Sequence, residues 1–253
     1  MLLFASLFLS SCHLQPAPQV IIKRGQFSQL NLATPIKLLN WNIAKKNQLA
    51  TWQQDLKEIL TTLQPDLLLI QEALIDIHSK DVFTLKQRGW YFAPNLFNPY
   101  QQTYAGVLTA SHAEALTAQS LITRNFEPAA KTPKTSLITE YALAQSEQTL
   151  WVTNVHAINF VSIDKFTAQL QQLEQKLRQH SGPLIMAGDF NTWNQTRLSL
   201  LTQMAKRLQL QLLCFTPQDQ AHIRHFLLSP PLDHIFYRGV YPYRSQVLMN
   251  IFS

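Results

Sequence analysis

Segments of two hydrophobic patterns alternate along the chain between residues 36 and 237. Short apolar runs, which are typical of strands buried on both faces, cover residues 36–43, 67–71, 150–156, 184–187 and 232–237. Weaker strand patterns cover 89–93, 104–110, 137–144 and 210–214. Apolar residues recur every three or four positions in three other segments, which predicts helices at 48–63, 163–177 and 195–208. The alternation predicts one layered α/β domain over residues 36–253.

The first residues resemble a bacterial export signal. Leu2–Leu9 is an apolar run that is too short to cross a bilayer as a helix, and it leads into Leu9-Ser10-Ser11-Cys12, which resembles a lipobox. We therefore expect a lipoprotein signal peptide over residues 1–12 and a lipid anchor on Cys12 in the cell envelope. The residue after the cysteine is not aspartate, which favours the outer membrane in a host with two membranes. A secreted or periplasmic protein is the alternative.

Residues 13–35 have few periodic apolar positions and contain three prolines, Pro16, Pro18 and Pro35. This composition predicts a linker between the anchor and the domain.

Composition narrows the classes of protein to consider. With 253 residues, 46% of them hydrophobic, the chain can form a sizeable core, and disorder of the whole chain is excluded. The formal charge of +6 favours a polyanionic partner such as nucleic acid or an anionic membrane, although no run of five basic residues marks a binding site. Two cysteines exclude a disulfide framework, and Cys214, in an apolar stretch, is predicted to be buried.

Polar side chains suited to metal or phosphate chemistry stand at the ends of four predicted strands. These ends are Asn-Trp-Asn-Ile at 40–43, Leu-Ile-Gln-Glu at 69–72, Thr-Asn-Val-His at 153–156 and Gly-Asp-Phe-Asn at 188–191. A single such residue is more often a cap or a turn former. Four of them in one chain indicate a shared site, because loops at strand ends build active sites.

The residue types at these ends suit a magnesium site. Glu72 offers the hard, charged oxygen that Mg²⁺ requires, and Asn42 offers a neutral oxygen. Asp189 and Asn191 are two residues apart, so in an extended segment both side chains would project from one face into the same site.

These four motifs, followed by Leu-Asp-His-Ile at 232–235, resemble the endonuclease/exonuclease/phosphatase superfamily in their order and separation. The resemblance covers about residues 36–237, and Gly-Asp-Phe-Asn is its most specific element. It implies a four-layer α/β sandwich in which two mixed β-sheets pack face to face with helices on the outside. It also implies a metal-dependent phosphoesterase, with Mg²⁺ as the cofactor and Mn²⁺ as the alternative. Glu72 would be the main metal ligand, with Asn42 beside it in the metal or phosphate shell.

The resemblance also assigns the other site residues. His156 would contact the phosphate or act as a general acid, and Asp189 would orient or activate the attacking water. Asn191 would bind a phosphoryl oxygen in the transition state. Asp233 matches the carboxylate that orients a second histidine, and Asn154 is expected to bind substrate.

The partner of Asp233 is the one part of the pattern that this chain does not show. Family members carry that histidine in a Ser-Asp-His-Pro-like segment after one further strand. This sequence instead ends with Met-Asn-Ile-Phe-Ser at 249–253. We therefore expect a C-terminally truncated member that lacks the last strand and this motif. His234 would point to the opposite face of its strand from Asp233 and is a poor substitute. His222 and His225 lie in the preceding loop and are two further candidates for the role.

The expected function is hydrolysis of phosphodiester or phosphomonoester bonds by a monomeric, nuclease-like enzyme. One alternative is a catalytically impaired relative that keeps a metal- or phosphate-binding surface. Another is a lipid phosphodiesterase of the sphingomyelinase or phosphoinositide type, because an anchored enzyme meets phospholipid headgroups. The sequence leaves the choice between nucleic acid and headgroup open, since family members differ mainly in their loops.

Overall fold

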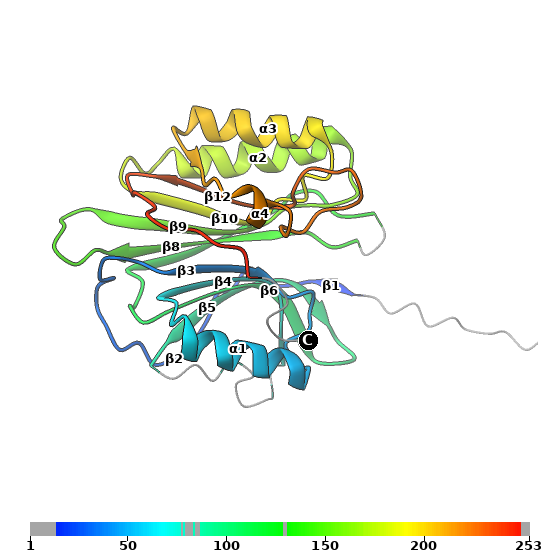
Figure 1. Cartoon of the computed structure of the whole chain (residues 1–253). Coiled ribbons are helices and arrows are strands. Elements are labelled where there is room, and N and C mark those ends of the chain that lie inside the picture. The colour runs from blue at the N-terminus through cyan, green and yellow to red at the C-terminus, as the bar shows by residue number, and fades with distance from the viewer. Residues whose placement is uncertain (1–13, 77, 79–82, 84–86, 129–130, 249–253) are drawn as a thin grey trace, which may run out of the picture.

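The computed structural model describes residues 14–76, 78, 83, 87–128 and 131–248 of the chain. Two six-stranded sheets lie face to face, with one long helix on the outside of the first sheet and two on the outside of the second (Figure 1). The predicted signal peptide lies outside the described residues. The predicted fold class, a four-layer α/β sandwich with two mixed sheets, is confirmed.

The first sheet has the strand order β1-β5-β6-β4-β3, with β2 also paired to β5. Only the β3–β4 pair is parallel, which makes the sheet mixed. Its strands are β1 (Gln15–Pro16), β2 (Ile22–Gly25), β3 (Leu38–Asn42), β4 (Leu67–Asp76), β5 (Gly89–Asn98) and β6 (Thr103–Ser111).

The second sheet has the order β11-β12-β10-β9-β8-β7, and in it only β9 and β10 are parallel. Its strands are β7 (Thr117–Ile122), β8 (Thr135–Ala142), β9 (Thr149–His156), β10 (Leu184–Asp189), β11 (Gln211–Leu212) and β12 (Asp233–Arg238). The helices are α1 (Ala50–Thr62), α2 (Ile163–Leu177), α3 (Gln195–Arg207) and the single turn α4 (Pro217–Gln220).

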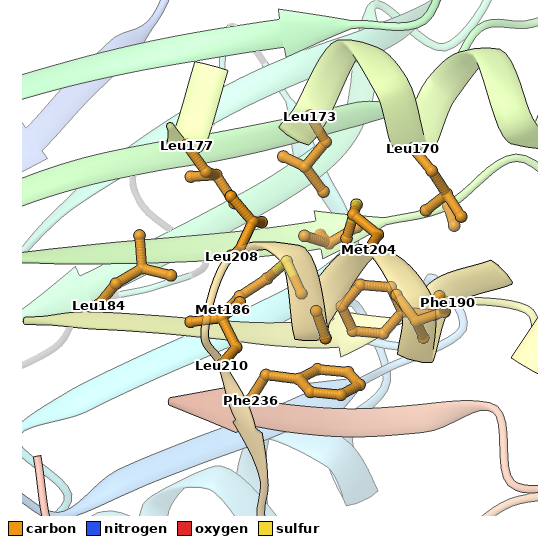
Figure 2. Close-up of a cluster of buried hydrophobic side chains, with 14 of the residues drawn as sticks. Leu170, Leu173, Leu177, Leu184, Met186, Phe190, Met204, Leu208, Leu210 and Phe236 are labelled. Carbon is orange, nitrogen blue, oxygen red and sulfur yellow. The ribbon is translucent and has the colours of Figure 1, made fainter. Parts of the chain in front are cut away.

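Three apolar layers hold the four layers of the fold together. Trp52 and Leu56 of α1 pack on the outer face of the first sheet. Leu67 and Leu69 of β4 meet Val152 of β9 between the sheets. On the outer face of the second sheet, the apolar sides of α2 and α3 cover β10 and β12, as Figure 2 shows for Leu170, Leu173, Leu177, Leu184, Met186, Phe190, Met204, Leu208, Leu210 and Phe236. Burial of this kind is the main stabilising contribution to a layered domain.

The prediction of a linker over residues 13–35 is wrong for residues 14–35. β1 and β2 both pair with β5 at the edge of the first sheet. Leu32 is buried between the sheets, with 1% of its surface exposed. Prolines are tolerated here because an edge strand can leave an N–H position unpaired. The folded domain therefore includes the stretch before Ile36.

Other differences from the predicted elements are smaller. The strand β7 and the short helix α4 were not expected, and β5 extends beyond the strand predicted at 89–93 as far as Asn98. Cys214 is exposed rather than buried. Within the described part of the chain, none of the helices has the length and the apolar character needed to span a bilayer.

Candidate active site

Strand register brings three of the predicted site residues to one end of the second sheet. β10 runs parallel to β9 with Asp189 opposite His156, and it runs antiparallel to β12 with Asp189 opposite Asp233. In the first sheet, β3 and β4 are parallel with Asn42 opposite Gln71, the residue before Glu72. Because the sheets face each other, these ends meet at one mouth of the sandwich.

A β-bulge in β4 directs Glu72 into this mouth. The pairing of β4 with β6 shifts between Ile70 and Ala73, so two residues of β4 face one of β6. Glu72 has a φ of 57°, in the left-handed region that non-glycine residues seldom adopt. Its Oε1 lies 3.8 Å from Nε2 of His156, and its Oε2 lies 3.7 Å from Nζ of Lys45.

Asn42 connects the carboxylates of the two sheets. Its Nδ2 donates to Oε1 of Glu72 at 3.2 Å and to Oδ2 of Asp189 at 2.8 Å. Its Oδ1 accepts from the backbone N–H of Ala44 at 2.9 Å. The amide oxygen that we expected near a metal is thus turned to the backbone. In this arrangement Asn42 is a donor that holds the two carboxylates, and Glu72 is the group open to a cation.

Asp189 follows a glycine that the packing of β10 requires. Gly188 has a φ of 150°, and a Cβ atom there would lie 1.9 Å from the carbonyl oxygen of Val155. The close approach of β9 and β10 places Asp189 beside His156. The Asp189 carboxylate accepts from Asn191 N at Oδ1, and from Asn42 Nδ2 and Arg224 Nη2 at Oδ2. A carboxylate has about four acceptor sites, so one remains for a water molecule.

Asn191 reaches the site in a different way from the one expected. The chain turns after Asp189, and Asn191 has a φ of 50°, so the two residues are not in an extended segment. Its Nδ2 donates to the carbonyl oxygen of Ala157 at 2.8 Å. Asn191 lines the pocket nonetheless, because the turn lies directly at its wall.

His156 is a buried, neutral imidazole at the base of the site. Burial lowers the pKa of His156 well below its usual value, and the positive charges of Lys134, Arg224 and Lys45 lower it further. A neutral imidazole has one N–H, which can donate a hydrogen bond to a phosphate oxygen. Of the two expected roles, phosphate contact therefore fits the structure better than general acid.

Asp233 has an arginine beside it. Arg224 Nε lies 3.8 Å from Oδ2 of Asp233, and the same guanidinium donates to Asp189. Burial, followed by the negative charge of Asp189, raises the pKa of Asp233 to about 7, and Arg224 opposes the shift. Oδ1 of Asp233 is buried and has no hydrogen-bond partner in the described part of the chain.

None of the three histidines considered as substitutes is shown in contact with Asp233. The prediction for His234 is confirmed, since its Nε2 lies 2.8 Å from Oγ1 of Thr192 and its ring packs against Phe190 and Phe236. Nδ1 of His225 faces the carbonyl oxygen of Phe226.

The expected substrate contact of Asn154 is wrong. Asn154 is fully buried between the sheets, and its Oδ1 accepts from Nε2 of Gln71 at 2.7 Å. Its Nδ2 donates to the carbonyl oxygens of Ile70 at 3.2 Å and of Leu108 at 2.8 Å, which flank the bulge before Glu72. Asn154 therefore supports the backbone that presents Glu72 and does not reach the pocket.

The site opens into a pocket with a volume of about 320 Å³, lined by residues from both sheets and from four loops. Sequence reasoning missed several of them. Lys134 and Glu127 form an ion pair at 3.5 Å across the loop between β7 and β8. The lining residues are Glu72, Glu127, Lys134, His156, Asn159, Phe160, Asp189, Asn191, Arg224, Phe226 and Leu232.

The donor set suits one hard cation that keeps most of its water. Among the described residues, no group of three or more histidine, cysteine, aspartate or glutamate side chains is arranged around a common metal position. Mg²⁺ is commonly held by only one or two carboxylates together with water and substrate oxygens. Glu72, with 24% of its side chain exposed at an open pocket, fits that requirement.

Comparisons with known proteins agree with this geometry. The model of the Endonuclease/Exonuclease/phosphatase family matches residues 39–251. A UPF0294 protein of Vibrio parahaemolyticus is 36% identical over 206 residues, which cover 81% of this chain and 69% of that protein. The catalytic domain of human Nocturnin has a TM-score of 0.60 and 22% identity, over 82% of this chain and 84% of that one.

A second solved structure extends the likeness in fold. Danio rerio TDP2, in complex with a single-strand DNA product, has a TM-score of 0.55 and 14% identity, over 80% of this chain and 83% of that one. With the family model matching most of the chain, the sandwich and the clustered motifs have one explanation: this chain belongs to the endonuclease/exonuclease/phosphatase family.

Proposed function

We propose that the protein is a magnesium-dependent hydrolase of phosphate esters, with Mn²⁺ as an alternative metal. The observation that carries the proposal is the convergence of Glu72, Asp189 and His156 from separate strands on one open pocket. Family membership supports phosphoester hydrolysis in general.

The polar residues of the site have tasks that their contacts allow. Glu72 would hold the cation, and Asn42 and Lys45 fix the position of its carboxylate. A bound Mg²⁺ would neutralise the charge that develops on phosphoryl oxygens during attack. Asp189 orients water through its remaining acceptor site. His156 contacts a phosphoryl oxygen as a neutral ring.

Two further side chains face the negative charge of the substrate. Lys134 lines the pocket and pairs with Glu127 at 3.5 Å, and its ammonium is proposed to bind a phosphate oxygen as well. Asn191 retains a second amide N–H beyond the one given to Ala157 and is proposed to bind a phosphoryl oxygen.

A catalytically impaired relative is the second candidate, and the surroundings of Asp233 favour it. In the described part of the chain an arginine, and no histidine, lies beside this carboxylate. Oδ1 of Asp233 is the oxygen that could accept a hydrogen bond from a histidine. The protein would be a catalytically impaired relative if no histidine donates to this oxygen.

For the substrate, we propose a phosphodiester of nucleic acid, with a phospholipid headgroup as the alternative. The DNA product in the TDP2 complex and the positive charge of this chain support the first. Acylation of Cys12 and location in the cell envelope are proposed from the lipobox-like motif alone.

The test is Mg²⁺-dependent hydrolysis of a phosphodiester reporter, followed by DNA, RNA, sphingomyelin and phosphoinositides in parallel. Glu72→Gln should reduce metal affinity and turnover together, whereas Asp189→Asn should abolish turnover and leave Mg²⁺ binding by calorimetry largely intact. Glu147→Gln, at an exposed carboxylate in the turn between β8 and β9, is the matched control and should change neither.

The outcomes separate the two candidates. Parental activity in both site variants would refute the assigned roles. If the parent is inactive, activity that appears when a Ser-Asp-His-Pro-like tail is appended supports the impaired relative. Inactivity of both chains on every substrate rejects an enzyme.

A further inference from the structure

Exposed apolar side chains gather around the mouth of the pocket. The loop between α4 and β12 carries Phe226, Leu227 and Leu228, which are 49%, 91% and 96% exposed. Phe160, in the loop after β9, is 70% exposed and lines the pocket together with Phe226. Large aliphatic and aromatic side chains in such exposed positions on a folded domain indicate contact with an apolar partner.

Strand directions place two more such residues at the same end of the sandwich. Leu49, between β3 and α1, is 52% exposed, and Tyr100, in the turn from β5 to β6, is 66% exposed. β6 begins at Thr103, which pairs with Asp76 at the end of β4, beyond Glu72. We call the set Leu49, Tyr100, Phe160, Phe226, Leu227 and Leu228 the apolar rim.

Local hydrogen bonds hold parts of the apolar rim in place. Phe160 has a φ of 49°, and its N–H donates to Oδ1 of Asn159, which also accepts from Nε1 of Trp193 at 2.9 Å. In the other loop, the N–H of Phe226 donates to Oγ of Ser229, and the N–H of Ser229 donates to the Phe226 carbonyl at 3.0 Å. Both rings are therefore held in their exposed positions by hydrogen-bonded turns.

Basic residues lie at the same end of the sandwich as the apolar rim. Lys45 and Lys46 are exposed between β3 and α1, and Arg124 and Lys131 are exposed between β7 and β8, at the same end of the sandwich. Exposed apolar side chains together with lysine and arginine at one end of a domain suit the interface of a bilayer that contains anionic lipids.

The chain also enters the fold at this end. Gln15 of β1 pairs with Phe97, next to the last residue of β5, so Leu14 lies at the pocket end of the first sheet. Figure 1 shows β1 and the loop before β12 at the same right-hand end. Cys12 is two residues before Leu14 in the sequence. An acyl chain on Cys12 would therefore enter the membrane beside the pocket.

We infer that the pocket end of the sandwich docks on an anionic lipid bilayer, with Leu227 and Leu228 entering its interface. The orientation of the domain on the membrane depends on the proposed acylation of Cys12. The apolar rim and the basic residues at the same end do not depend on it. β1 and β3 are the opposite edge strands of the first sheet, four strand spacings or about 19 Å apart. With the anchor and the apolar rim both at the membrane, the pocket would face the bilayer, and this orientation favours the phospholipid headgroup, the alternative substrate, over nucleic acid.

The experiment measures binding of the unlipidated full chain, Cys12→Ala, to vesicles of phosphatidylethanolamine and phosphatidylglycerol by co-sedimentation. The double variant Leu227→Ser/Leu228→Ser should reduce the partition coefficient about tenfold or more. Leu30→Ser/Tyr241→Ser removes two side chains that are 79% and 94% exposed at the opposite end, and it should leave partitioning unchanged. All four positions are exposed, so circular dichroism should show parental melting for both variants.

The inference would be overturned if Cys12→Ala did not bind vesicles, or if both double variants lost vesicle binding equally. It would also be overturned if Leu227→Ser/Leu228→Ser kept its vesicle binding and bound a single-stranded oligonucleotide more weakly. Weaker self-association in sedimentation velocity without a change in vesicle binding would likewise assign the apolar rim to a second copy. Because no readout needs turnover, failure of docking is distinct from failure of the proposed hydrolase.

Discussion

Asn154→Ala separates the structural role of this residue from the substrate contact that its sequence position suggests. The substitution removes the donor to the carbonyl oxygens of Ile70 and Leu108 and one of the acceptors of Gln71. Gln71 keeps Oδ1 of Asn40 at 2.9 Å, so the loss falls mainly on the two carbonyls. At about 1–3 kcal/mol for each of these two buried groups, the free energy of unfolding should fall by roughly 2–6 kcal/mol.

The assay is urea unfolding followed by far-ultraviolet circular dichroism and tryptophan fluorescence. Gln119→Ala, an exposed amide on β7, is the control and should cost less than about 0.5 kcal/mol. Because the two carbonyls flank the bulge, Mg²⁺ affinity should fall together with stability. A cost below about 1 kcal/mol with a raised KM and unchanged kcat would refute this reasoning and restore Asn154 as a substrate contact.

Three further substitutions test other parts of the structure. Asp233→Asn should raise the free energy of unfolding above pH 7 by about 1–3 kcal/mol. The pKa of the Asp233 carboxyl is about 7 in the folded protein and 3.8 in the ordinary state, so the contribution of this carboxyl to stability is complete below pH 3.8 and is lost as pH rises towards 7. Urea titrations at pH 8 and 3.5 check this, and an equal gain at both would contradict it. Hydrogen bonds to two arginines lower the pKa of Glu174 to about 2, so Glu174→Gln should cost about 1–2 kcal/mol at pH 7. This loss of unfolding free energy in Glu174→Gln is present above pH 4.5 and should shrink as pH falls towards 2. A loss that persisted at pH 2.5 would contradict the pairing of Glu174 with the two arginines. Gly188→Ala should cost more than about 2 kcal/mol by thermal melting, since its Cβ would meet the Val155 carbonyl; a parental melting temperature would show that β9 and β10 can move apart.

The elements with a clear hydrophobic period were predictable from the sequence. The strands that end in Asn42, His156 and Asp189 lie where the apolar runs placed them, and so does the first half of β4, which leads to Glu72. Their convergence followed from the family resemblance, since periodicity alone does not choose a topology. Arg224 was missed because it lies in an irregular loop, 35 positions beyond the aspartate it contacts.

The errors within the site have a common geometric origin. Asn154 and His156 are two residues apart on β9 and share a face, but only the last residue of the strand reaches the mouth, while the earlier one meets the opposite sheet. Asn191 was assigned to an extended segment that in fact turns. An alternating pattern identifies a face of a strand, and depth along that face depends on where the partner sheet ends.

Arg224 gives the pocket an internal counterion. Its guanidinium lies against Asp189 and beside Asp233, two carboxylates that are opposite each other in adjacent strands. Repulsion between them is therefore offset by the polypeptide itself, and folding of this end does not have to wait for a metal. A divalent ion held by Glu72 would add a second positive charge near this guanidinium and weaken the hold on the loop that carries Arg224, so that metal occupancy and loop position would be coupled properties.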